Sequence, residues 1–543
     1  MSGAARPYRL QPRRGLFLQN GLQRRFLNHF ISKAPPSDAD PSRTPGRFRL
    51  AVKDNIATRD LPTTCASAIL DNYHSPFDAT VVSQLRARGA EVVGKTNLDE
   101  FGMGSHSTHS AFGPVRFRRR DDSADAGNSA TIDLSAGGSS GGSAVAVVGR
   151  READLALGTD TGGSVRLPAA YTGVVGFKPS YGMISRHGVV PYANSLDTVG
   201  FLAPDVLTIS NVVAGPGGLY AEHDPRDPTS LSESARRRCT AAREGYSVVG
   251  DGEAESPARS NGAGASSWPL AGLTFGLPLE YNIEELDGAI RDAWAASAQR
   301  LQDAGARIVP VALPSTRHAL SAYYVIAPAE ASSNLAKYDG VRYGRRDPSR
   351  SDAAADGILY AATRGRGFGD EVCRRILLGS YTLSSEAMDN YFLQAQRVRR
   401  LVRRDFDRVF ALSNPLLDGG QGDSAVLDES TTPFDLSDLP EGVPLEDKRG
   451  PAQVDFLLTP TAPTLPPHLD DVLAPAAASP VDAYVNDVFT VPASLAGLPA
   501  ISIPVPVKVP SASAVAGLQL VGQYWDDARL LAVAESISRL IAE

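Results

Sequence analysis

Residues 134–179 read LSAGGSSGGSAVAVVGRREADLALGTDTGGSVRLPAAYTGVVGFKP and hold two glycine-flanked serine clusters, 137–143 and 162–164. Glycine at this density lets backbone N–H groups approach a ligand closely, which suits a loop that holds an anion or an oxyanion. Serine is the nucleophilic side chain common to both clusters. The first cluster alone has the composition of a flexible linker. The alanine and valine stretch after it and the ALGTDTGGSVRLPAA segment are not linker sequence, so an ordered, serine-bearing site is expected.

These clusters resemble the signature of the amidase signature family, the Ser-cis-Ser-Lys amidohydrolases. In that family the second cluster carries the nucleophile, which corresponds to Ser164. The first cluster carries a bridging serine that follows a cis peptide bond, which corresponds to Ser139 after Gly138. The third member is a lysine in a VKDNI motif, and residues 52–56 read VKDNI with Lys53. All three motifs occur in the family order, so together they are far more specific than any one of them.

The chemistry explains why these residue types are needed. A serine hydroxyl is a weak nucleophile until a base takes its proton, and neither cluster contains a histidine. A lysine can be that base only when neutral, so its pKa must fall from about 10.4, and the apolar residues 50–52 fit a strand end that desolvates Lys53. The resemblance implies that Lys53 abstracts a proton through Ser139 and that Ser164 attacks an amide carbonyl. It also implies an oxyanion hole made by the N–H groups of Thr161, Gly162, Gly163 and Ser164.

A narrower match lies on either side of the signature. Residues 94–114, GKTNLDEFGMGSHSTHSAFGP, resemble one branch of the family, the A subunits of glutamyl-tRNA(Gln) amidotransferases, whereas other amidases keep mainly the GKTN part. Residues 180–206 continue that match. His106 and His109 have a spacing that a metal could use, but glycines flank them and no third ligand is near in sequence. No metal site is therefore expected.

Two further residues are candidates for substrate binding. Residues 337–344, KYDGVRYG, resemble the substrate-side motif of the branch, in which an arginine holds the glutamine α-carboxylate; Arg342 corresponds to it. A planar guanidinium matches a carboxylate with two parallel hydrogen bonds, which a lysine cannot do. The alternative for Arg342 is a structural ion pair with Asp339 or another acid. By the same resemblance Asp455, which leads the strand 455–463, faces the substrate's α-amino group.

Composition and length are those of a soluble globular protein with a large core. The chain has 543 residues, of which 42% are hydrophobic and 21% charged, and its net charge is −7. That charge gives no global positive field for nucleic acid. Three scattered cysteines, Cys65, Cys239 and Cys373, make neither a disulfide framework nor a zinc site and indicate a reducing compartment. No run of 18 apolar residues exists, so no membrane span is expected.

The fold expected from the resemblance is an α/β amidase-signature α/β/α sandwich with a mixed central sheet, spanning residues 46–543. Periodicity predicts helices at 80–88, 287–304 and 526–542 and strands at 91–95 and 306–311. Two stretches of low complexity, residues 223–268 and 414–453, are expected to be loosely ordered insertions because they hold little apolar sequence.

The N-terminal segment, residues 1–45, has the composition of a mitochondrial import presequence followed by a Pro-rich linker. Its first 37 residues hold seven Lys or Arg and no acid, and Leu18, Leu22, Phe26 and Phe30 recur every fourth residue. The segment predicts a mitochondrial matrix protein. The alternative is a basic N-terminal helix of the mature protein, and residues 27–31 resemble a segment that stays in the family's fold.

The resemblance implies the glutaminase subunit of a tRNA-dependent amidotransferase. Such a subunit hydrolyses glutamine and supplies ammonia to partner subunits that convert Glu-tRNA(Gln) to Gln-tRNA(Gln). The chain has no GxxxxGK[ST] phosphate loop, so it is expected to carry no cofactor, with ATP and Mg used by a partner that also makes the main tRNA contacts. One alternative is a free-standing amidase acting on another carboxamide. Another is an inactive scaffold, against which the intact Lys53, Ser139 and Ser164 argue.

Overall fold

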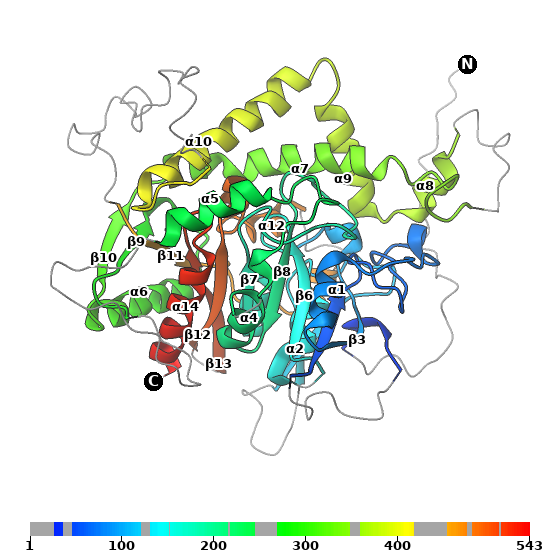
Figure 1. The fold of residues 1–543 in the computed structure, drawn as a ribbon. Helices are drawn as coiled ribbons and strands as arrows, with labels where there is room; N and C mark the ends of the chain where they lie inside the picture. Colours follow the sequence, from blue (N-terminus) through cyan, green and yellow to red (C-terminus); the bar gives the residue numbers. More distant parts are fainter. Residues whose placement is uncertain are drawn as a thin grey trace.

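The computed structural model describes residues 27–35, 46–120, 131–150, 152–215, 218–244, 269–347, 359–416, 453–474, 480–509 and 512–542. These residues form a large mixed sheet with helices on both faces (Figure 1). The predicted α/β/α sandwich is therefore confirmed. No helix in the described ranges is both long and apolar enough to cross a membrane.

The central sheet has eleven strands in the order β1-β3-β2-β6-β8-β7-β12-β13-β11-β9-β10. Their bounds are β1 (Phe30–Lys33), β2 (Phe48–Lys53), β3 (Ala90–Thr96), β6 (Leu155–Asp160), β7 (Val175–Lys178), β8 (Thr198–Ala203), β9 (Thr274–Pro278), β10 (Arg307–Val311), β11 (Phe456–Pro460), β12 (Ala500–Val509) and β13 (Ala512–Val521). The groups β3-β2-β6 and β11-β9-β10 are parallel, and the other neighbours are antiparallel. A separate antiparallel pair is formed by β4 (Arg116–Arg120) and β5 (Thr131–Ser135).

The α-helices of the described ranges are α1 (Thr80–Ala87), α2 (Gly141–Val147), α3 (Arg166–Thr172), α4 (Val206–Val213), α5 (Glu233–Glu244), α6 (Gly288–Asp303), α7 (Ala319–Leu335), α8 (Ala361–Gly367), α9 (Asp370–Thr382), α10 (Leu393–Val409), α11 (Leu469–Leu473), α12 (Pro480–Val485), α13 (Val491–Ala496) and α14 (Asp527–Ala542). Shorter turns are η3 (Ala68–Leu70), η4 (Glu100–Gly102), η5 (Val148–Arg150), η6 (Leu219–Ala221), η7 (Leu279–Tyr281), η8 (Pro314–His318) and η10 (Met388–Phe392).

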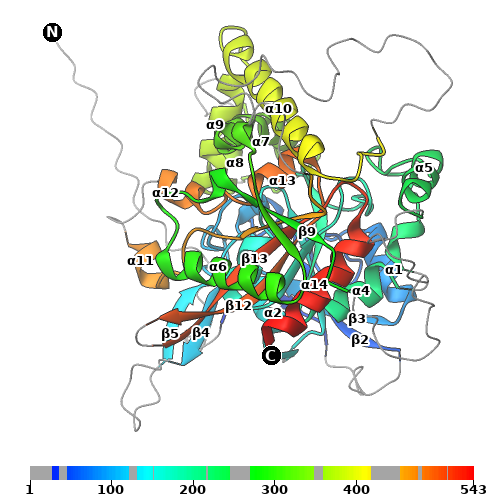
Figure 2. The same cartoon turned by 90° about the vertical axis from the view of Figure 1, so that its left-hand side faces the viewer.

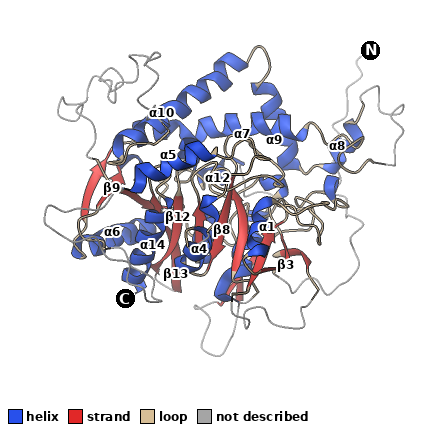
Figure 3. Cartoon of the chain, viewed as in Figure 1, coloured by secondary structure: helices blue, strands red, loops and turns tan. Residues whose placement is uncertain are grey.

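The two faces of the sheet are covered by different kinds of side chain. On one face α2 and α3 bring small residues such as Ala144, Ala146 and Ala169 against the strands, which allows a close approach. On the other face α1, α4, α6 and α14 bury larger side chains, among them Ile209 and Trp294. Figure 3 shows helices on both sides of the strands. The sheet is thus buried on both faces, and strands such as β6 and β8 are buried along their whole length.

A further group of helices, α7, α9 and α10, lies beyond one edge of the sheet, at the top of Figures 1 and 2. Gly379 of α9 packs against the carbonyl of Pro328 in α7 so closely that a Cβ would overlap it. Glycine is therefore required for this helix contact. Tyr323 of the same helix as Pro328 lies against Gly162, where a Cβ would be 2.6 Å from the tyrosine ring.

Strand direction gathers the signature motifs at that same edge. Strands β2 and β6 are parallel neighbours, with Val52 opposite Leu157, so their carboxyl ends lie side by side. Lys53 is the last residue of β2, and the nucleophile cluster follows the last residue of β6, Asp160. Strand β8 runs the opposite way and begins at Thr198 beside Asp160. The signature motifs therefore lie together at the ends of these strands.

Most of the predicted elements are confirmed within a residue or two. The predicted helices correspond to α1, α6 and α14, and the predicted strands to β3 and β10. Asp287 caps α6 by accepting a hydrogen bond from the N–H of Ala289, at 2.8 Å. An N-terminal Asp cap of this kind is the local signal that marks where a helix begins.

The first predicted insertion needs a correction, because residues 223–244 are ordered and include α5. Arg236 of α5 is buried and donates to the carbonyls of Leu231, Tyr220 and Met183, at 2.8–2.9 Å. Its guanidinium also lies over the ring of Trp525, 5.5 Å from the centroid. A low apolar content predicts disorder only when no polar group anchors the segment, and here one arginine does so. The rest of this insertion, 245–268, lies outside the described residues.

Two other predictions fall largely outside the described residues. Of the second insertion only 414–416 and 453 are described. Of the N-terminal segment, residues 27–35 are described, and Phe30 lies in strand β1 rather than in a helix. Residues 27–31 thus stay in the fold, as their resemblance implies, because β1 pairs with β3 at the edge of the sheet.

Candidate active site

Lys53 is fully buried at the end of β2 and is surrounded by hydroxyl groups. Its Nζ lies 2.8 Å from Ser139 Oγ, 2.8 Å from Ser140 Oγ and 3.0 Å from Thr159 Oγ1. The Thr159 carbonyl is 3.4 Å away. Two of the three predicted triad members, Lys53 and Ser139, are thus in direct contact.

Burial lowers the pKa of Lys53 from 10.5 to about 7, although the carboxylates of Asp99, Asp160 and Asp197 act in the opposite direction. Desolvation disfavours the charged form of an amine, and no carboxylate pairs directly with Nζ among the described residues. A large fraction of Lys53 is therefore neutral near neutral pH, which is what a lysine base requires.

Ser139 lies in the loop between β5 and α2 and follows a cis peptide bond at Gly138-Ser139, as the resemblance implies. Gly138 has no room for a side chain, since a Cβ there would lie 2.6 Å from the N of His106 and 2.7 Å from the carbonyl carbon of Ser105. The segment 105–107 therefore presses on the loop and fixes the path of Ser139.

Ser164 lies in the loop between β6 and α3 and is partly exposed. The two serine loops are joined, because the N–H of Ser140 donates to the carbonyl of Ser164 at 3.0 Å. The N–H groups of Thr161, Gly162, Gly163 and Ser164 donate to no described residue. Four free donors around a partly exposed serine are a suitable arrangement for an oxyanion.

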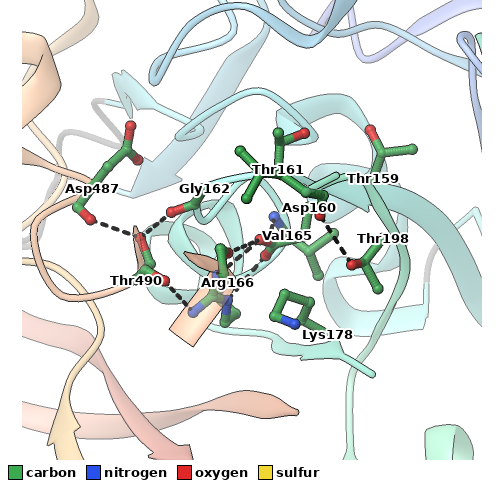
Figure 4. A network of polar contacts seen from close by, with 12 residues as sticks. Thr159, Asp160, Thr161, Gly162, Val165, Arg166, Lys178, Thr198, Asp487 and Thr490 are labelled. Carbon is green, nitrogen blue, oxygen red and sulfur yellow. Dashed lines mark hydrogen bonds and ion pairs between the residues drawn. The ribbon is translucent and has the colours of Figure 1, made fainter. Parts of the chain in front are cut away.

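A buried ion pair closes this loop at its base (Figure 4). Arg166 donates to both carboxylate oxygens of Asp160, at 3.0 and 2.8 Å, and both side chains are fully buried. The same guanidinium donates to the carbonyl of Thr490 and to Gln519 Oε1, at 2.9 and 2.8 Å. Because Asp160 and Arg166 bracket the loop 161–165, the pair fixes its two ends relative to each other.

Sequence reasoning missed Asp487, a buried acid that connects both serine loops. Its carboxylate accepts from Tyr324 Oη at 3.0 Å and from Ser105 Oγ at 3.2 Å, and Ser105 adjoins Gly138. The single hydrogen of the Thr490 hydroxyl lies between two carbonyls, with Oγ1 2.6 Å from the carbonyl oxygen of Gly162 and 3.1 Å from that of Asp487 (Figure 4). Burial raises the pKa of Asp487 to about 7.

Arg375 of α9 is a buried cation that Tyr324 links to this acid. It donates to Tyr192 Oη and to Glu371 Oε1, at 2.6 and 2.7 Å. Its guanidinium lies 5.5–5.7 Å from the ring centroids of Tyr192, Tyr324 and Tyr484. Tyr324 contacts both Asp487 and Arg375, so a buried acid and a buried arginine share one aromatic wall beside the Gly162 loop.

The two substrate-binding residues predicted from the sequence lie elsewhere. Arg342 is exposed and lines a surface hollow of about 700 Å³ whose lining includes none of Lys53, Ser139 and Ser164. Asp455 precedes β11, pairs with Arg529 Nη1 at 2.9 Å and accepts from the N–H of Thr274 at 2.9 Å. Both of its oxygens therefore serve contacts between β11, β9 and α14.

Within the described ranges no group of three or more His, Cys, Asp or Glu side chains could hold a metal ion. His106 instead bridges two polar side chains, with Nδ1 2.9 Å from Ser135 Oγ and Nε2 3.2 Å from Asn486 Nδ2. Burial lowers the pKa of His106 to about 4, so its imidazole is neutral.

This geometry agrees with the comparison to known families. The model of the amidase family matches residues 49–418 and 446–531. The chain belongs to the amidase family. The matched ranges include Lys53, Ser139 and Ser164, so the motif resemblance and the family model rest on the same part of this amidase.

Curated relatives show which members of the amidase family this chain is similar to. The amidase is 61% identical to the mitochondrial glutamyl-tRNA(Gln) amidotransferase A subunit of Neurospora crassa, over 96% of this chain and 95% of that protein. It is 52% identical to the protein of the same name from Emericella nidulans, over 96% and 98%. A crystal structure of the glutamyl-tRNA(Gln) amidotransferase A subunit from Thermotoga maritima matches with a TM-score of 0.63 and 31% identity, covering 94% of this chain and 86% of that one.

Proposed function

We propose that the chain is the glutaminase subunit of a glutamyl-tRNA(Gln) amidotransferase. It hydrolyses glutamine and supplies the ammonia that converts Glu-tRNA(Gln) to Gln-tRNA(Gln). The observation that carries the hydrolytic part is the contact between a buried Lys53 and Ser139 beside a partly exposed Ser164. Identity near 60% with fungal proteins of that name, over nearly the full length of both chains, supports the place of the chain in such a complex.

The reaction uses an acyl-enzyme. Neutral Lys53 accepts a proton from Ser139 as Ser139 takes the proton of Ser164, and Ser164 Oγ bonds to the carboxamide carbon. The N–H groups of residues 161–164 stabilise the oxyanion. The proton returns through Ser139 to the leaving nitrogen, which departs as ammonia. Water then hydrolyses the glutamyl ester by the same proton path and frees Ser164.

We assign recognition of the glutamine α-carboxylate to Arg375 and of its α-ammonium group to Asp487, in place of Arg342 and Asp455. Both are buried beside the Gly162 loop, whereas Arg342 is exposed in a separate hollow and Asp455 is committed to Arg529. A buried substrate carboxylate needs a fixed cationic partner, and Arg375 is held by Glu371 and three aromatic rings.

The chain acts with partner subunits, which use ATP and Mg and make the main contacts to tRNA. Large apolar side chains are exposed along the outer side of α9 and the turn after it, including Leu377 (72%), Tyr381 (57%) and Tyr391 (46%). A contiguous exposed apolar patch marks a protein interface, and we assign this one to a partner subunit. The names of the relatives and the basic N-terminal segment support a mitochondrial location.

The test is a glutaminase assay on the chain purified with its partner subunits. Ammonia release from glutamine is expected, and Ser164→Ala should abolish it while the complex still assembles, because losing one hydroxyl from a glycine-lined loop leaves little cavity. Residual turnover within tenfold of wild type would remove Ser164 from the nucleophile role. Hydrolysis of aryl amides but not of glutamine would favour the free-standing amidase instead.

A further inference from the structure

Asn55, two residues after Lys53, contacts Thr159, one of the residues whose hydroxyl group lies against the lysine amine. Its Nδ2 lies 3.1 Å from Thr159 Oγ1, which itself lies 3.0 Å from Lys53 Nζ. All three side chains are at least 95% buried. The contact chain thus runs from the Asn55 amide through one hydroxyl to the amine.

The positions of the hydrogens between Asn55, Thr159 and Lys53 depend on which atom of the Asn55 amide faces Thr159. The amide nitrogen faces it and donates, while Asn55 Oδ1 has no hydrogen-bond partner among the described residues. Thr159 Oγ1 makes no further hydrogen bond to a described residue, so the one acceptor within reach of its hydrogen is Lys53 Nζ. A neutral amine has a lone pair that can accept this hydrogen, and an ammonium has none.

We propose that Asn55 is a positioning residue: by donating to Thr159 it turns that hydroxyl so that it hydrogen-bonds the neutral amine of Lys53 and opposes the ammonium. The inference rests on the proposed role of Lys53 as the base. Ser140 does not have this effect, because its Oγ donates to the Thr159 carbonyl at 3.3 Å and is left free to accept from Nζ.

The arrangement serves both halves of the reaction. When Nζ turns its lone pair to Ser139 and gains a proton, the Thr159 hydrogen loses its acceptor. The ammonium formed is therefore a stronger acid than a freely solvated one and returns its proton readily to the leaving ammonia. Asn55 thus favours the base before attack and the acid after it.

The charged groups around Lys53 oppose this effect, which is why a neutral amide suits the position. They come from three elements: Asp99 follows β3, Asp160 ends β6 and Asp197 precedes β8, and the thiol of Cys65 is also near. Each of these carboxylates favours the ammonium. An aspartate at position 55 would add another carboxylate that favours the ammonium, separated from Lys53 by the Thr159 hydroxyl only.

The test measures the pH dependence of Ser164 phosphonylation by a fluorophosphonate in the purified complex, which needs no glutamine. Wild type is expected to react faster as Lys53 loses its proton. In Asn55→Ala the midpoint of this rise should move up by about one pH unit, the size of one net hydrogen bond. In the isosteric Asn55→Asp it should move up further. Plateau rates at high pH should stay within about threefold of wild type.

Two controls separate positioning from a structural role. Thr159→Val should also raise the midpoint, and combining it with Asn55→Ala should add little, because both changes act through one hydroxyl. Asn97→Ala should leave the midpoint unchanged, since Asn97 Nδ2 donates to the carbonyls of Asn28 and Gly113.

Three outcomes would overturn the inference. The first is an unchanged midpoint with a lower plateau in both Asn55 variants. The second is a midpoint that moves down, which is expected if Asn55 Oδ1 accepts from Thr159. The third is no labelling of wild-type Ser164. The last would also overturn the proposed triad. Normal labelling without glutamine hydrolysis would reject the proposed glutaminase function and leave the role of Asn55 standing.

Discussion

Lys53 sets the pH at which the proposed site works. Its pKa is lowered to about 7 by burial, and the amine must be neutral to accept a proton. The sign is therefore fixed: kcat/KM should rise as pH increases through about 7 and then level off. Lys53→Met should remove the rise and cost on the order of 1,000-fold in rate. Initial rates of ammonia release across the pH range measure both effects, and a flat wild-type profile would place the base elsewhere.

At the scale of single residues, the sequence predicts the residues of the reaction better than those that bind the substrate. Lys53, Ser139 and Ser164 lie in short motifs whose spacing indicates a serine nucleophile without histidine. Arg375 and Asp487 lie 112 positions apart in sequence and meet through Tyr324 of α7. No local pattern shows which of many arginines becomes buried, so the exposed Arg342 is the more visible candidate in the sequence.

Arg375 and Arg342 make opposite predictions for matched substitutions. Arg375→Lys keeps the charge but loses the planar fork, so the KM for glutamine should rise about tenfold or more, while an uncharged amide should lose little. Arg342→Lys should change neither. The comparison is kcat/KM for both substrates in both variants. If Arg342→Lys weakened glutamine selectively and Arg375→Lys did not, the carboxylate site would be the one predicted from the sequence.

At the scale of elements, the nucleophile loop depends on the Asp160–Arg166 pair that joins β6 to α3. Arg166→Leu would leave the Asp160 carboxylate buried without its cation, which typically costs about 3–5 kcal/mol. Denaturant unfolding of the complex measures this loss. Arg118→Leu is a matched control, because its pair with Asp133 is partly exposed and should contribute at most about 1 kcal/mol. Equal losses in the two variants would show that burial of the pair does not matter.

The elements themselves are predictable where one local signal marks them. The Asp287 cap and the apolar period mark the start of α6, and periodicity likewise indicates β3 and α14. Helix α5 has no such signal, because its mean composition is polar. Its order comes from Arg236, which donates to four backbone carbonyls, two of them in the distant segment of Gly182 and Met183. Composition reports what a segment can bury, whereas anchoring by one polar side chain depends on the rest of the fold.

At the scale of the whole molecule, the second insertion leaves and rejoins the fold at one point. The N–H of Ala411 donates to the carbonyl of Val454, and the N–H of Val454 donates to the carbonyl of Val409, both at 2.8 Å. The chain between them, including residues 417–452, starts and ends beside the same strand end of the sandwich. A segment with adjoining ends can be shortened at a small entropic cost, since that cost grows only with the logarithm of its length.

Replacing residues 417–452 with a short Gly/Ser linker should therefore leave the glutaminase rate of the complex within about twofold of wild type. The unfolding midpoint should be nearly unchanged, because loop shortening of this size shifts the free energy of unfolding by only about 1–2 kcal/mol. The measurement is ammonia release together with thermal unfolding of the assembled complex. As a contrast, deleting residues 233–244 should destabilise the chain, because it removes α5 and the buried Arg236. Loss of glutaminase activity in the 417–452 variant with assembly intact would give that segment a part in catalysis, and loss of assembly would make it part of the interface with a partner.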